Sequence, residues 1–275
     1  MKKFSIVTGG ASGLGYEFVK LLLKDNYNVI IIDNNKHELE TVKLNIEKKY
    51  LNKITLINKD LSKHNASLDI YNKLRNKNIE ILINNAGFGL FGKFVTTNWE
   101  VEKNMIMLHV MCTTELTKLF LKNMIKRKKG KILNMSSLAA FQPGPLMSIY
   151  YSTKTYILHF SEAIANELKN TGVSITVLCP GQTRTNFQKK VSSKKKKINF
   201  NFSSAEEVAK YGYKASKKGK TIAVPGIINK IIANIHRFIP RSLATSLMRK
   251  IQEKNRIRWG RNNIFDIIGE LSNKH

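Results

Sequence analysis

Short runs of apolar, β-branched residues alternate along this chain with longer segments in which apolar residues recur every three or four positions. The short runs predict buried strands at Phe4–Thr8, Asn28–Asp33, Ile54–Asn58, Ile81–Asn84, Lys131–Met135, Ser174–Cys179 and Lys220–Val224. The longer segments predict helices at Tyr16–Lys24, Lys36–Lys49, Leu68–Asn76, Met105–Ile125 and Tyr150–Asn170. This alternation predicts an α/β fold with a doubly wound parallel sheet of about seven strands in a three-layer sandwich.

Two segments depart from this pattern. Residues 186–204 contain the lysine-rich stretch 189–197, and the sequence allows either a mobile loop over the site or a solvated surface excursion. After Gly226, apolar residues recur at helical spacing among lysines and arginines, which predicts a pair of amphipathic helices. We therefore divide the chain into a body, residues 1–225, and a basic helical extension, residues 226–275. The extension either docks on the body or lies on an anionic membrane.

The chain is strongly basic, with a formal net charge of +28 over 275 residues. Because lysines are scattered and alternate with asparagines rather than aromatic residues, we attribute the charge to residue usage and expect no specific nucleic-acid site. The start of the chain leads directly into a strand, and no run of about 18 apolar residues occurs. We expect a cytoplasmic protein, with peripheral membrane contact as the alternative. The two cysteines lack ligand spacing, so no metal site is expected.

A glycine-rich turn follows the first predicted strand and opens the first predicted helix. It consists of Thr8, Gly9, Gly10, Ala11, Ser12, Gly13, Leu14 and Gly15. Glycines allow the backbone to approach a phosphate closely, and the helix N-terminus supplies free N–H groups and a partial positive charge. The turn therefore predicts a site for a nucleotide or dinucleotide.

Asp33 ends the second predicted strand, about 20 residues after the glycine-rich turn. A carboxylate at this place accepts hydrogen bonds from the adenosine ribose and repels a 2′-phosphate. Asn34 follows it where an NADP-binding site would favour arginine. The sequence therefore favours NAD(H), and Lys36 leaves NADP(H) as the alternative.

Further along the chain, Tyr150 and Lys154 are spaced to share one face of a helix. Hydride transfer to a carbonyl leaves an alkoxide that needs a proton, and a nearby ammonium is expected to lower the pKa of a phenol. Ser137 would hydrogen-bond the substrate oxygen. Tyr151 competes with Tyr150 as the acid/base, but only Tyr150 is followed by lysine at the required spacing.

Over residues 4–225 these motifs resemble the short-chain dehydrogenase/reductase family, which has a Rossmann-type fold. The tail and the stretch 141–145 resemble a bacterial DltE-like, ketoacyl-reductase-like subgroup. The resemblance implies that Tyr150 is the acid/base, Lys154 its partner and Ser137 the ligand of the substrate oxygen. Further cofactor contacts implied by it are Asp60, Leu61, Asn85, Ala86, Gly87, Pro180, Gly181, Thr183 and Thr185.

His109 departs from the family pattern. An ungapped alignment through residues 114–117 places it where the family usually carries a catalytic asparagine that helps hold a water in a proton relay. Histidine donates and accepts hydrogen bonds and titrates near neutrality, so it could serve the relay. A buried histidine without a catalytic role is an equal alternative.

Together these features predict an NAD(P)-dependent oxidoreductase that interconverts a ketone and a secondary alcohol. The loops near the predicted site are rich in apolar residues, which favours an acyl, lipid-like or steroid-like substrate. The alternative is a nucleotide-binding scaffold or a membrane-associated interaction protein with little redox activity. The helices predicted at Met105–Ile125 and Tyr150–Asn170 correspond to the family's subunit-contact helices, so we expect a homodimer or a homotetramer.

Overall fold

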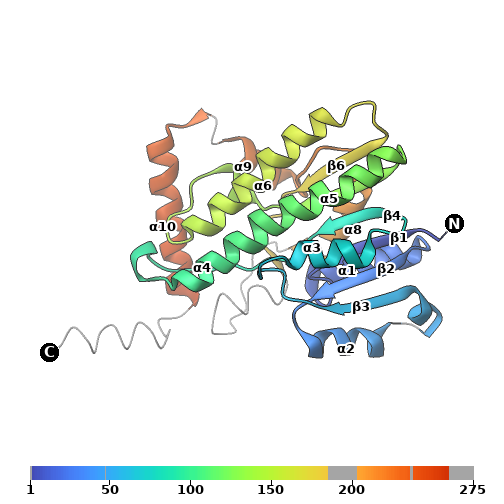
Figure 1. Cartoon of the computed structure of the whole chain (residues 1–275). Coiled ribbons are helices and arrows are strands. Elements are labelled where there is room, and N and C mark those ends of the chain that lie inside the picture. Colours follow the sequence, from blue (N-terminus) through green and yellow to red (C-terminus); the bar gives the residue numbers. More distant parts are fainter. Residues whose placement is uncertain (1, 47, 185–202, 236–237, 260–275) are drawn as a thin grey trace.

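The computed structural model describes residues 2–46, 48–184, 203–235 and 238–259. Its centre is a seven-stranded parallel sheet in the order β3-β2-β1-β4-β5-β6-β9 (Figure 1). The strands are β1 (Phe4–Thr8), β2 (Asn28–Asp33), β3 (Ile54–Asn58), β4 (Ile79–Asn84), β5 (Gly130–Met135), β6 (Val173–Leu178) and β9 (Ile222–Ala223). The predicted doubly wound sheet of about seven strands is confirmed.

Helices cover both faces of the sheet, because successive side chains of a strand point to opposite faces. One face packs against α1 (Gly13–Lys24), α2 (Lys36–Asn45) and α8 (Ala205–Lys217). The other face packs against α3 (Ala66–Leu74), α5 (Thr113–Lys126) and α6 (Ser148–Glu167). Phe18 on the first face and Phe120 on the second are almost completely buried. The two cores hold the sheet rigidly, so its carboxyl edge is a fixed platform for a site.

The predicted helix Met105–Ile125 is not a regular α-helix. It begins earlier, as α4 (Trp99–Ile106), passes through a π-helical turn at Met107–Cys112 and continues as α5. A π-turn widens the backbone and is frequent at functional sites. It contains His109 and therefore fixes where that imidazole lies.

Short elements connect the larger ones. They are the 3₁₀ turns Lys48–Lys53, Phe94–Thr96 and Leu138–Phe141, and a two-stranded parallel ladder between β7 (Thr183–Arg184) and β8 (Ser203–Ser204). The helix α8 begins with a capping box between Ser204 and Glu207. The lysine-rich stretch 189–197, predicted as a loop, lies outside the described residues.

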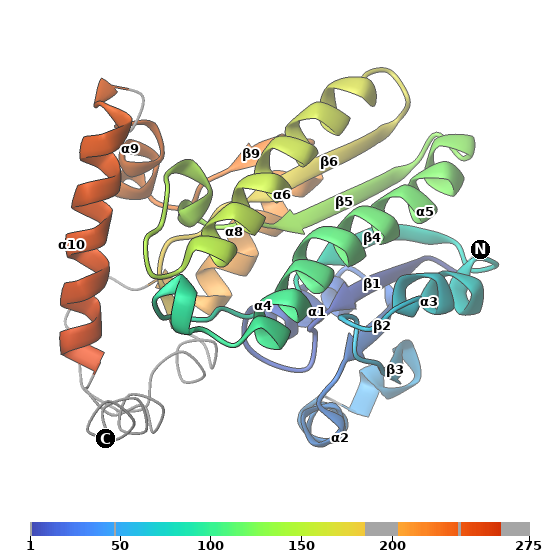
Figure 2. The same cartoon turned by 60° about the vertical axis from the view of Figure 1, so that its left-hand side comes forward.

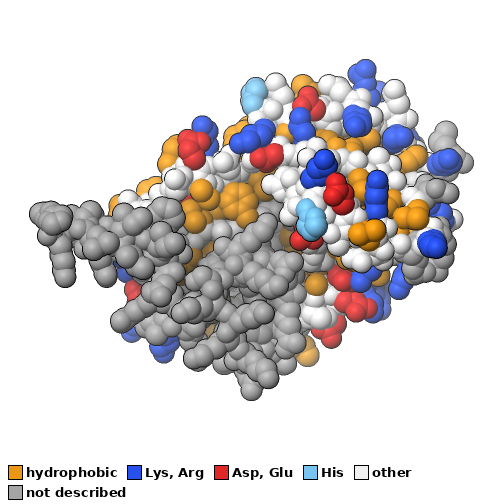
Figure 3. Space-filling view, turned by 90° about the horizontal axis from the view of Figure 1, so that it is seen from below, with side chains coloured by type: hydrophobic (Ala, Val, Ile, Leu, Met, Phe, Trp, Pro, Cys, Tyr) orange, Lys and Arg blue, Asp and Glu red, His pale blue; other side chains and the backbone are white. Residues whose placement is uncertain are grey.

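In its described residues the extension forms two helices, α9 (Ile227–Ile235) and α10 (Arg241–Trp259), at one end of the molecule (Figure 2). The helix α9 packs beside the 3₁₀ turn Leu138–Phe141. Within the described residues, no helix combines the length and hydropathy needed to cross a membrane. On the face shown in Figure 3, lysines and arginines lie among acidic and apolar side chains rather than in one continuous basic patch.

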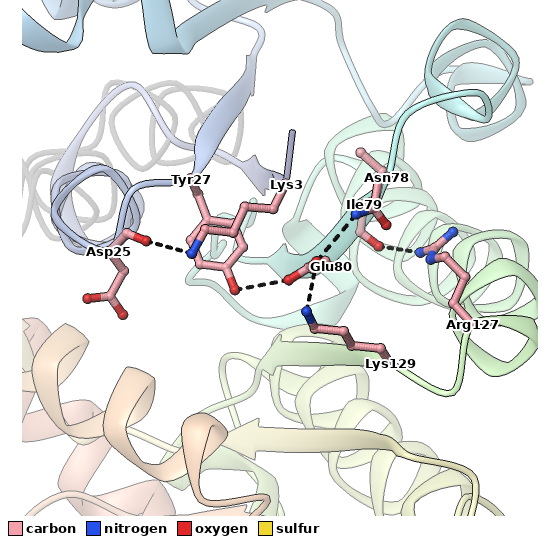
Figure 4. Close-up of polar contacts among 8 residues, drawn as sticks. All are labelled: Lys3, Asp25, Tyr27, Asn78, Ile79, Glu80, Arg127 and Lys129. Atoms are coloured by element: carbon pink, nitrogen blue, oxygen red, sulfur yellow. Dashed lines mark hydrogen bonds and ion pairs between the residues drawn. The ribbon is translucent and has the colours of Figure 1, made fainter. Parts of the chain in front are cut away.

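A polar cluster closes the opposite end of the sheet, at the start of β4 (Figure 4). Glu80 is only 8% exposed, and its carboxylate accepts hydrogen bonds from the Tyr27 hydroxyl at 3.4 Å and the Asn78 side chain at 3.3 Å. Lys129 lies 3.1 Å from the same carboxylate. Burial together with Glu80 raises the pKa of Tyr27 to about 12. The cluster joins β4 to β2 and to the turn before β5, far from the carboxyl edge.

Candidate active site

A cavity of about 1580 Å³ opens at the carboxyl edge of the sheet, where ligands bind in folds of this kind. Most of the residues expected at the site line it: Gly9, Ser12, Gly13, Leu14, Asp33, Asn34, Asp60, Leu61, Asn85, Ala86, Gly87, Ser137, Tyr150, Lys154, Pro180, Gly181 and Thr183. Thr8, Ala11, Gly15 and His109 lie behind the wall, and Thr185 is outside the described residues. One cavity therefore brings together motifs from seven segments of the sequence.

The glycine-rich turn is too tightly packed for side chains. A Cβ on Gly15 would lie 2.0 Å from the carbonyl oxygen of Gly9, and Gly9 itself has a φ of +61°. The side chain of Ser12 does not cap α1, and the first turn of that helix holds no acidic residue. The N–H groups at the start of α1 thus face the cavity without a competing anion, which suits a phosphate group.

Thr8 and Asn85 fix this turn to β4. The Thr8 hydroxyl accepts the N–H groups of Asn85 and Ala86, both at 3.0 Å. In return the Asn85 side chain donates to the carbonyls of Thr8 and Gly9, both at 3.0 Å. These reciprocal bonds explain why Thr8 belongs to the motif although it does not line the cavity.

Asp33 projects into the cavity from the end of β2 with its carboxylate held in place. One oxygen accepts the N–H of Ala11 at 3.1 Å, and the other accepts the N–H of Asn35 at 3.1 Å. The nearest lysine in the cavity wall is Lys59, whose ammonium lies 2.7 Å from Asp69. Each carboxylate oxygen keeps acceptor capacity for a further hydrogen bond, as binding of a ribose diol requires.

Tyr150 and Ser137 face each other across the floor of the cavity. The Tyr150 hydroxyl is hydrogen-bonded to the Ser137 side chain, which partly offsets the effect of burial; the pKa of Tyr150 is raised to about 12. The Ser137 oxygen also accepts the N–H of Ala139 at 3.2 Å. Because a hydroxyl can rotate, the Ser137 proton can turn from Tyr150 to a ligand oxygen when a ligand binds.

Lys154 lies beside Tyr150 as the helix spacing predicted. Its ammonium is 5.7 Å from the Tyr150 ring centroid and donates to the carbonyl of Met135 at 3.0 Å. Burial lowers the pKa of Lys154 to about 8. The causes of the raised pKa of Tyr150 are burial first, then the opposing hydrogen bond from Ser137, then Tyr151, and the lowering of this pKa by Lys154 stays a prediction. Tyr150 is therefore a protonated phenol at neutral pH.

His109 is completely buried behind this pair, in the π-turn. Its Nε2 accepts the N–H of Phe88 at 3.2 Å, and its Nδ1 lies 2.9 Å from the Thr153 hydroxyl. That hydroxyl donates to the carbonyl of Tyr150 at 2.8 Å, so Nδ1 is the donor to Thr153. Burial, followed by the charge of Lys154, lowers the pKa of His109 well below its usual value. The imidazole is thus neutral, and both of its nitrogens are bonded within the protein.

Tyr151, the competing candidate, has a different setting. Its hydroxyl accepts a hydrogen bond from Gln252 at 2.7 Å and lies 3.6 Å from the sulfur of Met248. Its ring fills the space next to Gly144, where a Cβ would lie 2.1 Å from the ring. Tyr151 therefore connects α6 to α10, while Tyr150 is the tyrosine bonded to Ser137.

The extension contributes to the cavity wall, which its sequence did not predict. Residues of α9 and α10 that line it include Ile228, Asn229, Ile232, Leu247, Met248 and Ile251. The apolar spacing after Gly226 predicted both helices, but sequence alone does not show toward which surface their faces turn. In the loop region after β4, Phe88 lines the cavity, whereas Phe94 is exposed.

The residues present fit a nicotinamide dinucleotide. The glycine turn leaves room and N–H groups for phosphates, and Asp33 offers acceptors for a ribose. Tyr150, Ser137 and Lys154 line the same cavity. Among the described residues, no group of three or more His, Cys, Asp or Glu side chains is arranged to hold a metal.

Comparison with known proteins gives the same family. The model of the family described as short chain dehydrogenase matches residues 3–196. The 17-beta-hydroxysteroid dehydrogenase type 3 of Mus musculus is 31% identical over 197 residues, which cover 70% of this chain and 64% of that protein. The very-long-chain 3-oxoacyl-CoA reductase of Homo sapiens is 32% identical over 186 residues, which cover 65% of this chain and 58% of that protein.

A solved structure supports the fold independently. The short-chain dehydrogenase from Sphingobium yanoikuyae in complex with NADPH has a TM-score of 0.73 and 20% identity, covering 88% of this chain and 98% of that chain. The chain therefore belongs to the short-chain dehydrogenase family, as its motifs predicted. The matches span less than two thirds of the length of the two curated relatives.

Proposed function

We propose that this protein is an NAD(P)-dependent reductase that converts an apolar ketone to a secondary alcohol. The observation that carries the proposal is the Tyr150 hydroxyl, bonded to Ser137 and flanked by Lys154, in the cavity that begins at the glycine-rich turn. A scaffold without redox activity would not need this arrangement. The reaction is the predicted interconversion of a ketone and a secondary alcohol, now taken in the direction of reduction.

In this reaction the bound nicotinamide cofactor supplies the hydride. Ser137 donates a hydrogen bond to the substrate oxygen and stabilises the charge that develops there. Tyr150, with its pKa raised to about 12, is protonated at neutral pH and donates its proton to the alkoxide, a much stronger base than a phenolate. Lys154 contributes N–H donors to a cofactor ribose hydroxyl and charge to the resulting phenolate.

We further propose that NAD(H) is preferred over NADP(H). The Asp33 carboxylate at the end of β2 would repel a 2′-phosphate, and Lys59 is engaged by Asp69. Calorimetric titration of the purified protein should give a lower Kd for NADH than for NADPH. Replacement of the carboxylate (Asp33→Ser) should bring the two Kd values together, whereas Glu40→Ser, at an exposed position on α2, should not. Tighter binding of NADPH by the unmodified protein would contradict the preference.

The proposed activity has a direct test. Addition of a simple ketone such as pentan-2-one to protein saturated with NADH or NADPH should cause loss of the reduced-cofactor absorbance. Absence of turnover with every ketone, together with absence of binding of both cofactors, would overturn the proposal.

For His109 we propose a positioning role. Its two hydrogen bonds join the loop after β4 to α6 immediately beside Tyr150. Neither ring nitrogen is directed at the cavity, and the lowered pKa keeps the ring from carrying a proton. These contacts favour a role in holding the segment that carries Phe88 over a role as a proton carrier.

A further inference from the structure

The cavity does not end at Tyr150 but continues between α9 and α10. We define the tail groove as this continuation, lined by Ile228, Ile232 and Ile235 of α9 and by Leu247, Met248 and Ile251 of α10. All six side chains are apolar. The groove is continuous with the space next to Tyr150, so a molecule reacting there can extend into it.

The groove exposes much of its apolar surface to solvent. Ile228 is 66% exposed, Ile235 50% and Leu247 52%. The side chains that these helices bury are Ala233 of α9 and Ala244, Met248 and Gln252 of α10, so docking uses only Met248 of the six groove residues. Exposed apolar area of this kind is costly in water, and an apolar ligand that covers it gains about 25 cal/mol per Å².

The groove wall is fixed relative to the catalytic tyrosine. Gln252 of α10 donates to the hydroxyl of Tyr151, the residue next to Tyr150, at 2.7 Å. Met248 lies 3.9 Å from the Gln142 amide nitrogen, in the loop that precedes α6. On the other side, Asn229 of α9 donates to the carbonyl of Pro225 at 2.6 Å. The groove is therefore part of the site rather than a separate surface.

The groove has no means of holding a charged or strongly polar ligand among the residues described. Between residues 226 and 252 the lining contains no charged side chain, and its two amide side chains, Asn229 and Gln252, already donate to protein acceptors. From Ala244 to Ile251 the wall extends about 10 Å along α10 at 1.5 Å per residue. An apolar groove of this length is complementary to an extended hydrocarbon chain.

We propose that the tail groove binds the straight hydrocarbon chain of the substrate while its ketone is held by Ser137 and Tyr150. The inference rests on the proposed function, which it deepens by naming the substrate class: straight-chain ketones, including acyl compounds with a keto group near one end. It predicts that each added methylene that enters the groove raises kcat/KM by about two- to fourfold until the groove is filled.

The test compares methyl ketones from pentan-2-one to tridecan-2-one on the full chain with saturating cofactor. Leu247→Lys and Ile232→Lys should lower kcat/KM for tridecan-2-one at least about tenfold more than for pentan-2-one. The matched controls are Leu243→Lys and Ile231→Lys, because these residues lie on the same helices, are 57% and 58% exposed and do not line the cavity. Both controls should keep the wild-type chain-length profile.

Calorimetric titration with tridecan-2-one measures binding alone and does not depend on turnover. It therefore separates this inference from the proposed function. If Leu247→Lys weakens the binding of tridecan-2-one and Leu243→Lys leaves it intact, the groove binds the chain. That result supports the inference even if no ketone is reduced. A flat chain-length profile in the wild type, or equal effects of groove and control substitutions, overturns the inference while leaving the reductase activity standing.

Discussion

At the scale of single residues, burial rather than charge pairing sets the chemistry of this site. It raises the pKa of Tyr150 to about 12 and lowers that of Lys154 to about 8. It also keeps His109 neutral. Without a cofactor, the pair is therefore a protonated phenol beside a lysine that titrates near physiological pH. Such a pair is suited to giving a proton to a reduced substrate.

His109→Asn should retain turnover within about tenfold of wild type, because an asparagine oxygen can accept the N–H of Phe88. His109→Leu should lose much more, since that N–H would then be buried without a partner, at a cost of about 1–3 kcal/mol. Steady-state kinetics of the two variants measures the difference. A collapse of turnover in His109→Asn would instead assign proton transfer to the imidazole.

The His109→Asn substitution should also change how the free energy of unfolding depends on pH. The folded-state pKa of His109 lies well below 6.5, so below that pH the unfolded chain binds a proton that the folded chain does not. The free energy of unfolding therefore falls as the pH drops below 6.5. Denaturant titrations should show a smaller acid loss in His109→Asn than in wild type, and parallel losses would contradict the buried neutral ring.

Single residues could be predicted from the sequence where the chemistry of the site needs one particular type of side chain. Asp33, Ser137, Tyr150 and Lys154 all line the cavity as predicted. The raised pKa of Tyr150 was not predicted, because the degree of burial depends on packing from distant segments. The role of Tyr151 was equally invisible, since its partner Gln252 is 101 residues away.

At the scale of elements, strands were predicted closely because parallel strands buried on both faces read as continuous apolar runs. The break of the predicted helix Met105–Ile125 at the π-turn could not be read from its apolar spacing. The helix α8 was not predicted either, although Ser204 and Glu207 form a capping box whose sequence signature was available.

We expect the polar cluster at the start of β4 to stabilise the folded protein (Figure 4). Glu80→Ala should lower the free energy of unfolding by about 1–3 kcal/mol, because it leaves Tyr27, Asn78 and Lys129 without their shared partner. Chemical denaturation measures this loss. The control Glu100→Ala breaks an exposed pair with Lys103 and should change the free energy by less than about 1 kcal/mol. Equal effects would mean that the cluster adds no stability.

At the scale of the whole molecule, we propose that the positive charge of the chain and the apolar surface of α9 bind an anionic membrane. Ile227, Ile231 and Phe238 are 76%, 58% and 84% exposed and surround a shallow hollow together with Lys230. Apolar side chains beside a lysine suit the boundary between lipid headgroups and acyl chains. This surface lies next to the tail groove, so a membrane contact would place the groove close to apolar substrates.

Sedimentation with phosphatidylserine-rich vesicles tests this contact. The double substitution Ile231→Glu and Phe238→Glu should reduce the sedimented fraction severalfold at physiological salt. Leu44→Glu alters an 85% exposed leucine on α2 and should have little effect. If Leu44→Glu reduced sedimentation as much, the attraction would come from net charge alone, and the membrane surface assigned here would be wrong.

The central claim is that Tyr150 is the proton donor of a ketone reductase. The most direct test compares the kcat of the Tyr150→Phe and Tyr151→Phe variants with that of the wild type. Tyr150→Phe should lose at least about 10²-fold in kcat with an unchanged Kd for the cofactor, because only the transferred proton is removed. Tyr151→Phe should stay within about tenfold of wild type, because it removes only a hydrogen bond to α10. Wild-type turnover in Tyr150→Phe would contradict the account, and so would a larger loss in Tyr151→Phe.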